Sequence, residues 1–368
     1  MRQKETVSAF QMSMLFLSYG TGSAIINIPA PLTGAARNGA WISIVLSCIM
    51  GMLLLAIVMY MHRRYPDLDF IQYGEKTLGK WLMFLIAIPY LCSIFFMLAL
   101  IVIDIGTFFN STMLKETNSD VIRALFFLLA AVTARGGIEV MVRMFVLLLL
   151  STLVFITIVW CMAAPNYHPQ FLLPLMPDGI KPILHGTYIA YGFPFAEVSL
   201  FAMLLPYVRD KDKKSLHKPM FAALLVNGLT LLISVICTIM AEGSLAGELK
   251  YSLYQLARLI SIQEIFERVE SVIGFSLIIL SYMKATIVLY ILSKVLTRWA
   301  KVRNEQLLIF PVAFVCLLLS FTMYENEPDF VEAVSVIWPL LNNVAFNLPL
   351  LLIAAVTLVK RFTLRLRR

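Results

Sequence analysis

Three ionisable side chains lie inside long apolar stretches of this chain, where charge is least expected. Asp104, Glu197 and Lys284 each have mainly hydrophobic neighbours in sequence. Where such a stretch crosses a membrane, a charge is costly, so it usually faces protein, pairs with an opposite charge or lines a pathway. We therefore expect these three residues to give electrostatic support to a site. Asp104 has the alternative of reaching the membrane surface, because it lies near the end of its stretch.

Two of the apolar stretches contain residues that interrupt a helix. The first is YGTGSAIINIP at 19–29, in which Gly20 and Gly22 can unwind the chain and Pro29 removes a backbone hydrogen bond. The second is YGFPF at 191–195, where Gly192 and Pro194 form the same combination. Each stretch is therefore predicted to be a broken helix.

Backbone groups that a break frees must find partners within the protein, because lipid offers none. The two breaks predict a site near the middle of the membrane, where freed amides and carbonyls face a small polar ligand. Gly20, Gly22 and Ser23 are expected to present amides to a carboxylate, and Phe193 and Phe195 to close over the ligand. The alternative is that glycine and proline only kink these helices, since both are frequent in membrane helices.

The composition identifies an integral membrane protein. Hydrophobic residues make up 60% of the 368 residues and charged residues 14%, against roughly 45–50% and about 25% in soluble domains. A spanning helix needs ~20 mostly apolar residues. Ten stretches are predicted to span the membrane: 8–32, 40–62, 81–108, 120–135, 140–163, 183–206, 219–241, 270–296, 306–323 and 334–359. The alternative for the first is a signal peptide, but its apolar run is longer than is typical of one.

The positions of the breaks predict an internal repeat. They lie about 170 residues apart, close to half of the chain, and many secondary transporters consist of two inverted five-helix repeats. Residues 1–180 are predicted to form the first repeat and 181–368 the second, within a single transmembrane domain. Two amphipathic segments, 69–80 and 251–271, follow the second span of each half and are predicted to be helices on opposite sides of the membrane.

In inverted-repeat carriers the eighth span packs beside the first and near the sixth. Glu197 and Lys284 are therefore expected to form a buried pair, either a structural one or one that couples to a ligand or proton. Sodium-coupled carriers of this architecture place the ion between the first and eighth helices. Because Lys284 would take over the electrostatic role of that ion, we predict no sodium dependence.

Lysine and arginine residues predict the orientation of the chain. With the N-terminus inside, 22 of the 30 fall on the cytoplasmic side and seven outside, and Lys284 lies within a span. Since basic residues favour the cytoplasmic side of short loops, both termini are predicted to be cytoplasmic. The net charge of +8 is then explained by topology and attraction to membrane lipid headgroups, and no nucleic-acid partner is predicted.

No motif for catalysis or metal binding is found. The five cysteines lie in or at the ends of apolar stretches without CxxC spacing, and the four histidines form no HExxH. A phosphate-binding loop and a GxSxG elbow are also missing from the sequence. We predict that the chain is not an enzyme and uses no cofactor and no metal.

Several short motifs resemble the B-subunit family of spore germinant receptors, within the amino acid, polyamine and organocation (APC) transporter superfamily. The matching stretches are GTGSAIINIP, TLGKW at 77–81, FPFAEVSLF followed by LLPYVRDKDKK, FERVES at 266–271 and the basic tail. The resemblance implies an all-α fold of the LeuT/APC type with a 5+5 inverted repeat and broken first and sixth helices. It covers essentially the whole chain.

The resemblance also implies a function in spore germination. It implies a multi-pass protein of the inner spore membrane that binds an amino acid-like germinant and signals through A-type and lipoprotein C-type subunits. The ligand-binding residues expected from the motifs and breaks together are Gly20, Gly22, Ser23, Met97, Tyr191, Phe193, Pro194, Lys284 and Val288. Lys284 and Val288 stand where amino acid-sensing members are expected to have a threonine and an aromatic hydroxyl, which leaves the germinant open.

A permease of the same superfamily is the alternative function. Such a protein, proton-coupled or uncoupled, would use the same site and move the amino acid across the membrane. The segments EIFERVES and RDKDKKSLHK are candidates for docking partner subunits, and both are equally compatible with solvated loops.

Overall fold

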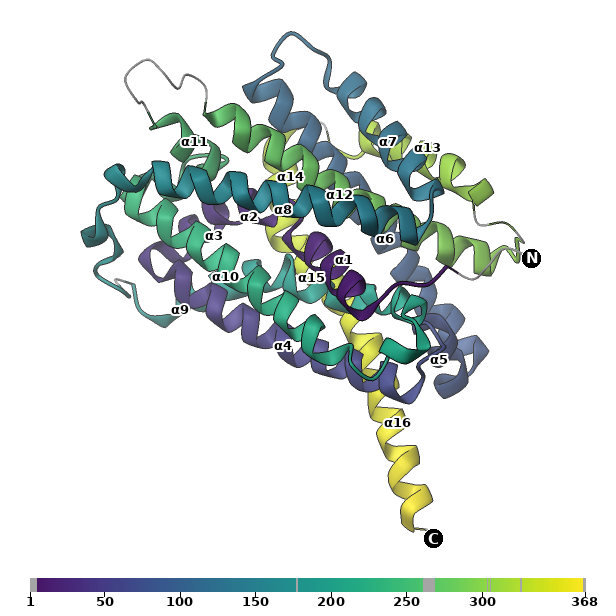
Figure 1. Ribbon diagram of the computed structural model, residues 1–368. Coiled ribbons are helices and arrows are strands. Elements are labelled where there is room, and N and C mark those ends of the chain that lie inside the picture. The colour runs from purple at the N-terminus through teal and green to yellow at the C-terminus, as the bar shows by residue number, and fades with distance from the viewer. Residues whose placement is uncertain are drawn as a thin grey trace.

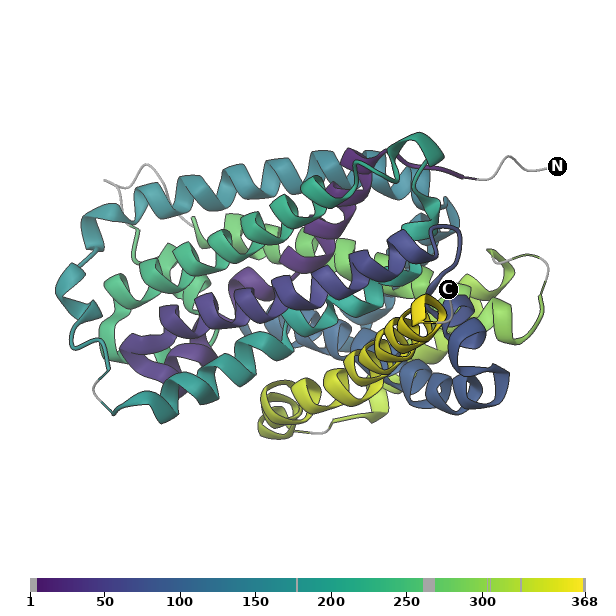
Figure 2. The ribbon, with the colours of Figure 1, turned by 90° about the horizontal axis from the view of Figure 1, so that it is seen from below.

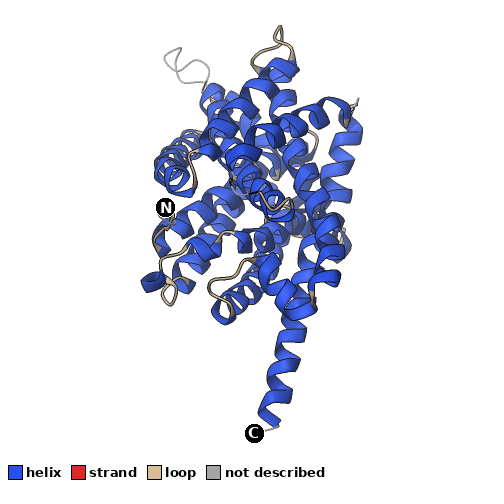
Figure 3. Ribbon diagram, turned by 90° about the vertical axis from the view of Figure 1, so that its right-hand side faces the viewer, coloured by secondary structure: helices blue, strands red, loops and turns tan. Residues whose placement is uncertain are grey.

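The computed structural model describes residues 5–176, 178–260, 269–302, 304, 306–324 and 326–366. Within these ranges the chain forms helices joined by loops and contains no β-strand (Figure 3). Most of the long helices run roughly side by side and form one bundle (Figures 1 and 2). The C-terminal part of the last helix extends away from it (Figure 1).

The helices follow the order of the predicted spans. In the first half they are α1 (Ala9–Thr21), α2 (Ala24–Asn27), α3 (Pro29–Ala36), α4 (Ala40–Arg64), α5 (Phe70–Leu78), α6 (Lys80–Thr112), α7 (Ser119–Arg135) and α8 (Ile138–Met162). The second half contains α9 (Ile180–Gly192), a 3₁₀ segment (Phe195–Met203), α10 (His217–Glu242), α11 (Ser252–Arg258), α12 (Glu270–Trp299), α13 (Gln306–Thr322), α14 (Glu327–Glu332), α15 (Trp338–Asn342) and α16 (Leu348–Leu366). Two π-helical turns, Ala333–Ile337 and Asn343–Asn347, flank α15.

All ten predicted spans coincide with helical segments. Six helical stretches are by themselves long and apolar enough to cross a membrane: Pro29–Arg64, Lys80–Thr112, Ile138–Met162, His217–Glu242, Glu270–Trp299 and Pro328–Arg361. The remaining predicted spans are the 17-residue helices α7 and α13 and the two broken ones, whose continuous helical pieces are shorter. The prediction of an all-α membrane fold with broken first and sixth helices is confirmed.

Loops predicted to share a side of the membrane meet at the same end of the bundle. At one end, Val7 exchanges backbone hydrogen bonds with residues 207 and 209, and Arg298 pairs with Asp69. At the other end, Arg37 pairs with Asp178 at 2.8 Å. Which end faces the cytoplasm, and the division into repeats at residue 180, stay predictions.

Of the two predicted amphipathic helices, the first is confirmed as α5. Asp69 caps its N-terminus by accepting a hydrogen bond from the Gln72 amide, and Phe70 and Tyr73 are buried against the bundle. The second is shorter than predicted, because α11 ends at Arg258. Residues 261–268, which include most of EIFERVES and the start of FERVES, lie outside the described residues.

The side-chain distribution is that of a membrane protein. Helix α12 lies at the centre and packs against α1, α6, α7, α8, α11 and α13. Large apolar side chains cover the periphery instead, among them Leu53 on α4, Trp81 on α6 and Leu147 on α8, which are 63%, 85% and 71% exposed. Such an apolar exterior is stable in lipid, which leaves the polar residues of the interior as candidates for function.

Candidate functional site

The first break lies where the sequence predicts it. Helix α1 ends at Thr21, and Gly22 adopts φ +34° before α2 begins at Ala24. A Cβ atom on Gly22 would lie 2.7 Å from Cδ of Lys284, so a larger residue has neither the backbone conformation nor the space. Across the bundle, the Ser234 hydroxyl of α10 donates to the Ile25 carbonyl at 3.0 Å.

The second break is supported by asparagines from the tenth span. Helix α9 ends at Gly192, and the chain continues as a 3₁₀ segment from Phe195. The Asn342 side chain donates to the Gly192 carbonyl at 2.8 Å, and Asn347 accepts a hydrogen bond from Ser199 at 2.7 Å. Backbone and hydroxyl groups at the break thereby find partners inside the protein, as irregular backbone at membrane depth requires.

Glu197 and Lys284 form the buried pair expected from the sequence. Nζ of Lys284 lies 2.5 Å from Oε2 of Glu197, and the two side chains are 0% and 1% exposed. The other carboxylate oxygen accepts a hydrogen bond from Nε1 of Trp338 at 2.9 Å. The ammonium group also lies 3.8 Å from the centroid of the Phe193 ring, within range of a cation–π interaction. Both charges are therefore compensated by fixed neighbours.

Asp104 lies inside the protein. It is 8% exposed, and Nδ2 of Asn27 donates to its Oδ2 at 2.5 Å. The long helix α6 continues for two further turns beyond Asp104, which favours a position inside the protein over one at the membrane surface. The contact ties α6 to α2, directly after the first break.

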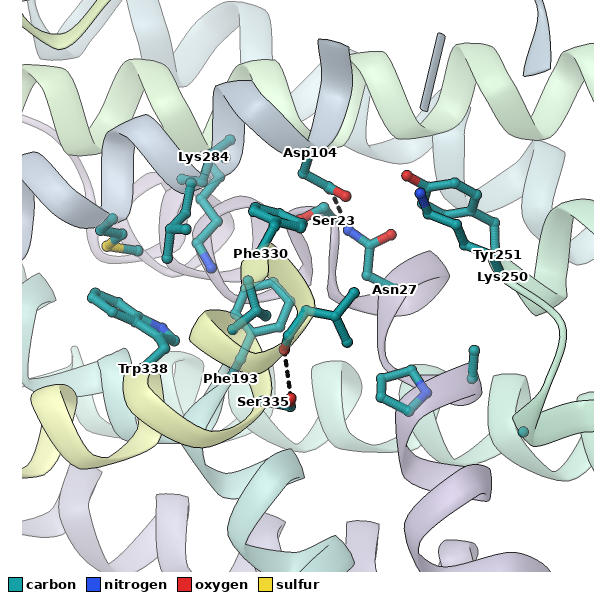
Figure 4. Close-up of a pocket in the computed structure, with 18 of the residues that line it drawn as sticks. Ser23, Asn27, Asp104, Phe193, Lys250, Tyr251, Lys284, Phe330, Ser335 and Trp338 are labelled. Atoms are coloured by element: carbon teal, nitrogen blue, oxygen red, sulfur yellow. Dashed lines mark hydrogen bonds between the residues drawn. The ribbon is translucent and has the colours of Figure 1, made fainter. Parts of the chain in front are cut away.

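A cavity of about 360 Å³ lies where these elements meet (Figure 4). Its lining comes from α2, α3, α6, the second break, residues 247–251, α12 and residues 330–338. Figure 4 shows Lys284 and Trp338 on one side of the cavity and Asp104 and Asn27 toward the opposite side, nearer Lys250 and Tyr251. We call Lys284, Glu197 and Trp338 the ion-pair end, and Asp104, Asn27 and Ser23 the acceptor end. Met97, Leu100, Ile101 and Val334 add apolar surface.

The cavity brings together six of the residues singled out from the sequence. They are Ser23, Met97, Asp104, Phe193, Glu197 and Lys284. They come from four separate segments of the chain, so their proximity is a product of the tertiary fold. Their roles toward a ligand stay predictions.

The other predicted ligand-binding residues do not line this cavity. Gly20 and Pro194 border a small separate hollow beside α10, and Gly22 packs against the Lys284 side chain. The Tyr191 hydroxyl accepts a hydrogen bond from Asn347 at 3.2 Å, and Val288 is fully buried in the core. Phe195, expected to close over the ligand, instead lies against Gly51. Any effect of these residues on a ligand would be indirect in this conformation.

Other lining residues were missed in the sequence analysis. Asn27 had a signal, because its amide interrupts an apolar run directly after the first break, and Trp338 lies beside the polar pair of asparagines in WPLLNN. Residues 247–251 and Phe330 had none, since they follow from loop packing. Among the described residues, no three His, Cys, Asp or Glu side chains are grouped to hold a metal ion.

Comparison with known sequences gives a consistent set of matches. The profile of the Spore_permease family, described as "Spore germination protein", matches residues 6–328. The chain is 26% identical over 350 residues to spore germination protein KB of Bacillus subtilis (strain 168), covering 94% of this chain and 92% of that protein. It is 22% identical over 324 residues to spore germination protein XB of Bacillus anthracis, covering 85% and 88% of the two chains.

Three solved structures with a similar fold include a symporter and a transporter by title. MhsT, in complex with L-phenylalanine, superposes with a TM-score of 0.72 at 13% identity, covering 96% of this chain and 89% of that one. A Na⁺-coupled sialic acid symporter gives a TM-score of 0.69 at 12% identity, covering 93% and 81%. The nucleobase-cation-symport-1 family transporter Mhp1 gives 0.66 at 12% identity, covering 93% and 76%. At these identities the similarity establishes the LeuT/APC-like fold alone.

Proposed function

This chain belongs to the Spore_permease family of spore germination proteins, and from that premise we propose that it is the nutrient-binding membrane subunit of a spore germinant receptor. Its ligand is a small polar nutrient of the amino acid type. The chain acts by binding, and no catalytic step is part of the proposal.

The observation that carries this proposal is the cavity at the two helix breaks. Its volume of about 360 Å³ lies at the lower end of the range for small-molecule sites, roughly 300–1,000 Å³. Like such sites, it combines an apolar wall with a few convergent polar groups. A small nutrient fits this volume, and in transporters of this architecture the ligand site lies between groups of helices that move relative to one another in alternating access.

Signalling would follow from differential binding. A ligand that binds one arrangement of the two half-bundles more tightly shifts the equilibrium between them by its difference in affinity. We propose that A-type and lipoprotein C-type subunits detect this shift, with the complex in the inner spore membrane and both termini in the cytoplasm. The candidate docking segment RDKDKKSLHK begins at Arg209, directly after Val208, which forms an isolated β-bridge with Val7 near the N-terminus. This is the end proposed to be cytoplasmic.

An amino acid permease is the second candidate, favoured by one observation: two of the three similar structures named above are symporters by title. Both functions use the same cavity. They differ in whether the solute leaves on the opposite side of the membrane.

One experiment tests both functions. Equilibrium binding of the proteinogenic amino acids is measured on the purified full-length chain, and accumulation of the strongest binder is measured in proteoliposomes. Binding without accumulation supports the receptor, whereas accumulation supports the permease. Leu100→Trp fills the cavity from α6 and should abolish binding, while the matched change Leu147→Trp on the exposed face of α8 should not. Unchanged binding by a folded Leu100→Trp variant would show that the ligand site lies elsewhere.

A further inference from the structure

We propose that the cavity selects its ligand by a primary ammonium group, which binds at the acceptor end between the Asp104 carboxylate and the side-chain oxygen of Asn27. This inference rests on the proposed function, because it names the chemical group by which that same cavity recognises its nutrient. The orientation follows: the ammonium lies at the acceptor end, and the apolar part of the ligand lies toward the ion-pair end.

Asp104 is a buried carboxylate whose negative charge is only partly stabilised by neighbouring groups. Its one hydrogen bond from a side chain comes from the neutral amide of Asn27, and it forms no ion pair with any residue that the structure describes. A buried ionised carboxylate is stable only when charge or several hydrogen bonds compensate it. The Lys250 ammonium lines the same cavity and acts on Asp104 through space, but the two form no ion pair among the described residues. A cation bound at Asp104 would therefore add a direct partner for its carboxylate.

Asn27 presents a second acceptor at the same place. Its Nδ2 donates to Asp104, which fixes the orientation of the amide, since only the nitrogen can donate to a carboxylate. Its Oδ1 must therefore point elsewhere, and this atom is buried without a hydrogen-bond partner within the described ranges. Leaving a buried acceptor unpaired is unfavourable. The Ser23 hydroxyl, which also lines the cavity, can act as a third acceptor.

These acceptors match the donors of one chemical group. A primary ammonium carries three N–H donors and no acceptor. A neutral hydroxyl offers one donor, and a carboxylate offers none and would be repelled by Asp104. The acceptor end therefore discriminates in favour of an ammonium by both charge and hydrogen-bonding pattern.

The ion-pair end cannot take that role. Both oxygens of Glu197 already accept hydrogen bonds, from Lys284 and Trp338. The Lys284 ammonium would repel a second cation, and the Phe193 ring lies against it at 3.8 Å. The rings of Phe193 and Trp338, both in the lining, suit the apolar part of a ligand. Figure 4 shows the Trp338 ring on the side of the cavity away from Asp104 and Asn27.

The test compares ligands that differ by one group. Binding to the purified full-length chain is measured for each proteinogenic amino acid, its deaminated carboxylic acid and its decarboxylated amine, with a neutral sugar and a nucleoside included. We expect an amino acid or amine to bind, and loss of the ammonium to weaken binding at least 100-fold. A deaminated acid that binds as tightly as its parent overturns the inference without help from any variant.

Variants localise the effect. Asp104→Asn should weaken binding of the ammonium ligand by about 10- to 100-fold, and Asn27→Ala by less. The matched control is Asp178→Asn, an exposed carboxylate paired with Arg37 outside the cavity, which should leave binding unchanged. Equal affinity of the wild type and Asp104→Asn overturns the inference but leaves the proposed function standing.

The same panel separates the two proposals. Binding of the sugar or nucleoside alone, abolished by Leu100→Trp, supports the proposed cavity and overturns ammonium recognition. If no solute in the panel binds the wild type, both proposals are wrong for this chain.

Discussion

Each end of the cavity contains a buried carboxylate, and the two carboxylates differ in how fully neighbouring groups satisfy them. At the ion-pair end, a carboxylate, an ammonium and an indole form a closed set in which Glu197 has partners on both oxygens. At the acceptor end, the carboxylate of Asp104 meets one amide, and the amide oxygen of Asn27 has no partner among the described residues.

We infer from this difference that the polar groups of the ion-pair end stabilise the fold, whereas those of the acceptor end are available to bind a ligand. A satisfied buried network holds helices together, and the ion-pair end joins the second break, α12 and α15. An incompletely satisfied one costs stability unless something binds to it. The comparison predicts that changes at the ion-pair end alter mainly the fold, whereas changes at the acceptor end alter mainly ligand binding.

The largest effect is expected from breaking the ion pair. Lys284→Met leaves Glu197 buried without its cation, which should destabilise the protein by roughly 3–5 kcal/mol. Thermal unfolding of the purified chain in detergent measures this loss.

The double variant is the control for this prediction. Glu197→Gln combined with Lys284→Met removes both charges and should recover most of the lost stability, because no uncompensated charge remains. A single variant as stable as the wild type would show that the ion-pair end does not stabilise the fold.

A further effect is expected at the first break, which borders the ion-pair end. Gly22→Ala combines an unfavourable backbone, φ +34°, with a Cβ atom 2.7 Å from Cδ of Lys284. Gly79→Ala is its matched control, because Gly79 has φ +92° but nothing within 4 Å of a new Cβ. Backbone strain of about 1–3 kcal/mol applies to both variants, and overpacking adds roughly 1–3 kcal/mol at Gly22 alone. Equal melting temperatures for the two would show that Lys284 moves away from residue 22 without cost.

The smallest effect on stability is expected at the acceptor end. Asp104→Asn keeps the shape of the side chain and its ability to accept from Asn27, so the free energy of unfolding should change by less than about 1 kcal/mol. The same exchange at the other end, Glu197→Gln, removes the charge facing Lys284 and should cost more. Comparing the two melting curves tests the contrast directly. A larger loss for Asp104→Asn would reverse our assignment of the two ends.

Much of the architecture could be predicted from the sequence because its causes are local. A spanning helix depends on the length and polarity of one stretch, so all ten spans were found, including the short α7. The breaks depend on Gly22, Gly192 and Pro194, whose backbone preferences act wherever they lie. The helix predicted at 251–271 was overestimated in length, because amphipathic periodicity does not show where a short helix such as α11 ends.

The candidate site was only partly predictable. Asp104 and Asn27 are 77 residues apart, and Glu197 and Trp338 are 141 apart. Nothing in either stretch by itself indicates the partner. Predicting a cavity residue from its nearness to a break was also insufficient. Gly20 lies against Asn227 of α10 and Val288 is buried in the core, while residues 247–251 reach the cavity from a loop.

The sequence by itself determined that this chain is a membrane protein of ten spans with two broken helices and a carboxylate and an ammonium suited to pairing, since burial in lipid requires helices and penalises lone charges. Only the tertiary structure decided which of the polar groups are satisfied by one another and which face a cavity. That outcome depends on how helices pack side by side, and packing brings together atoms whose distance along the chain carries no information about their distance in space.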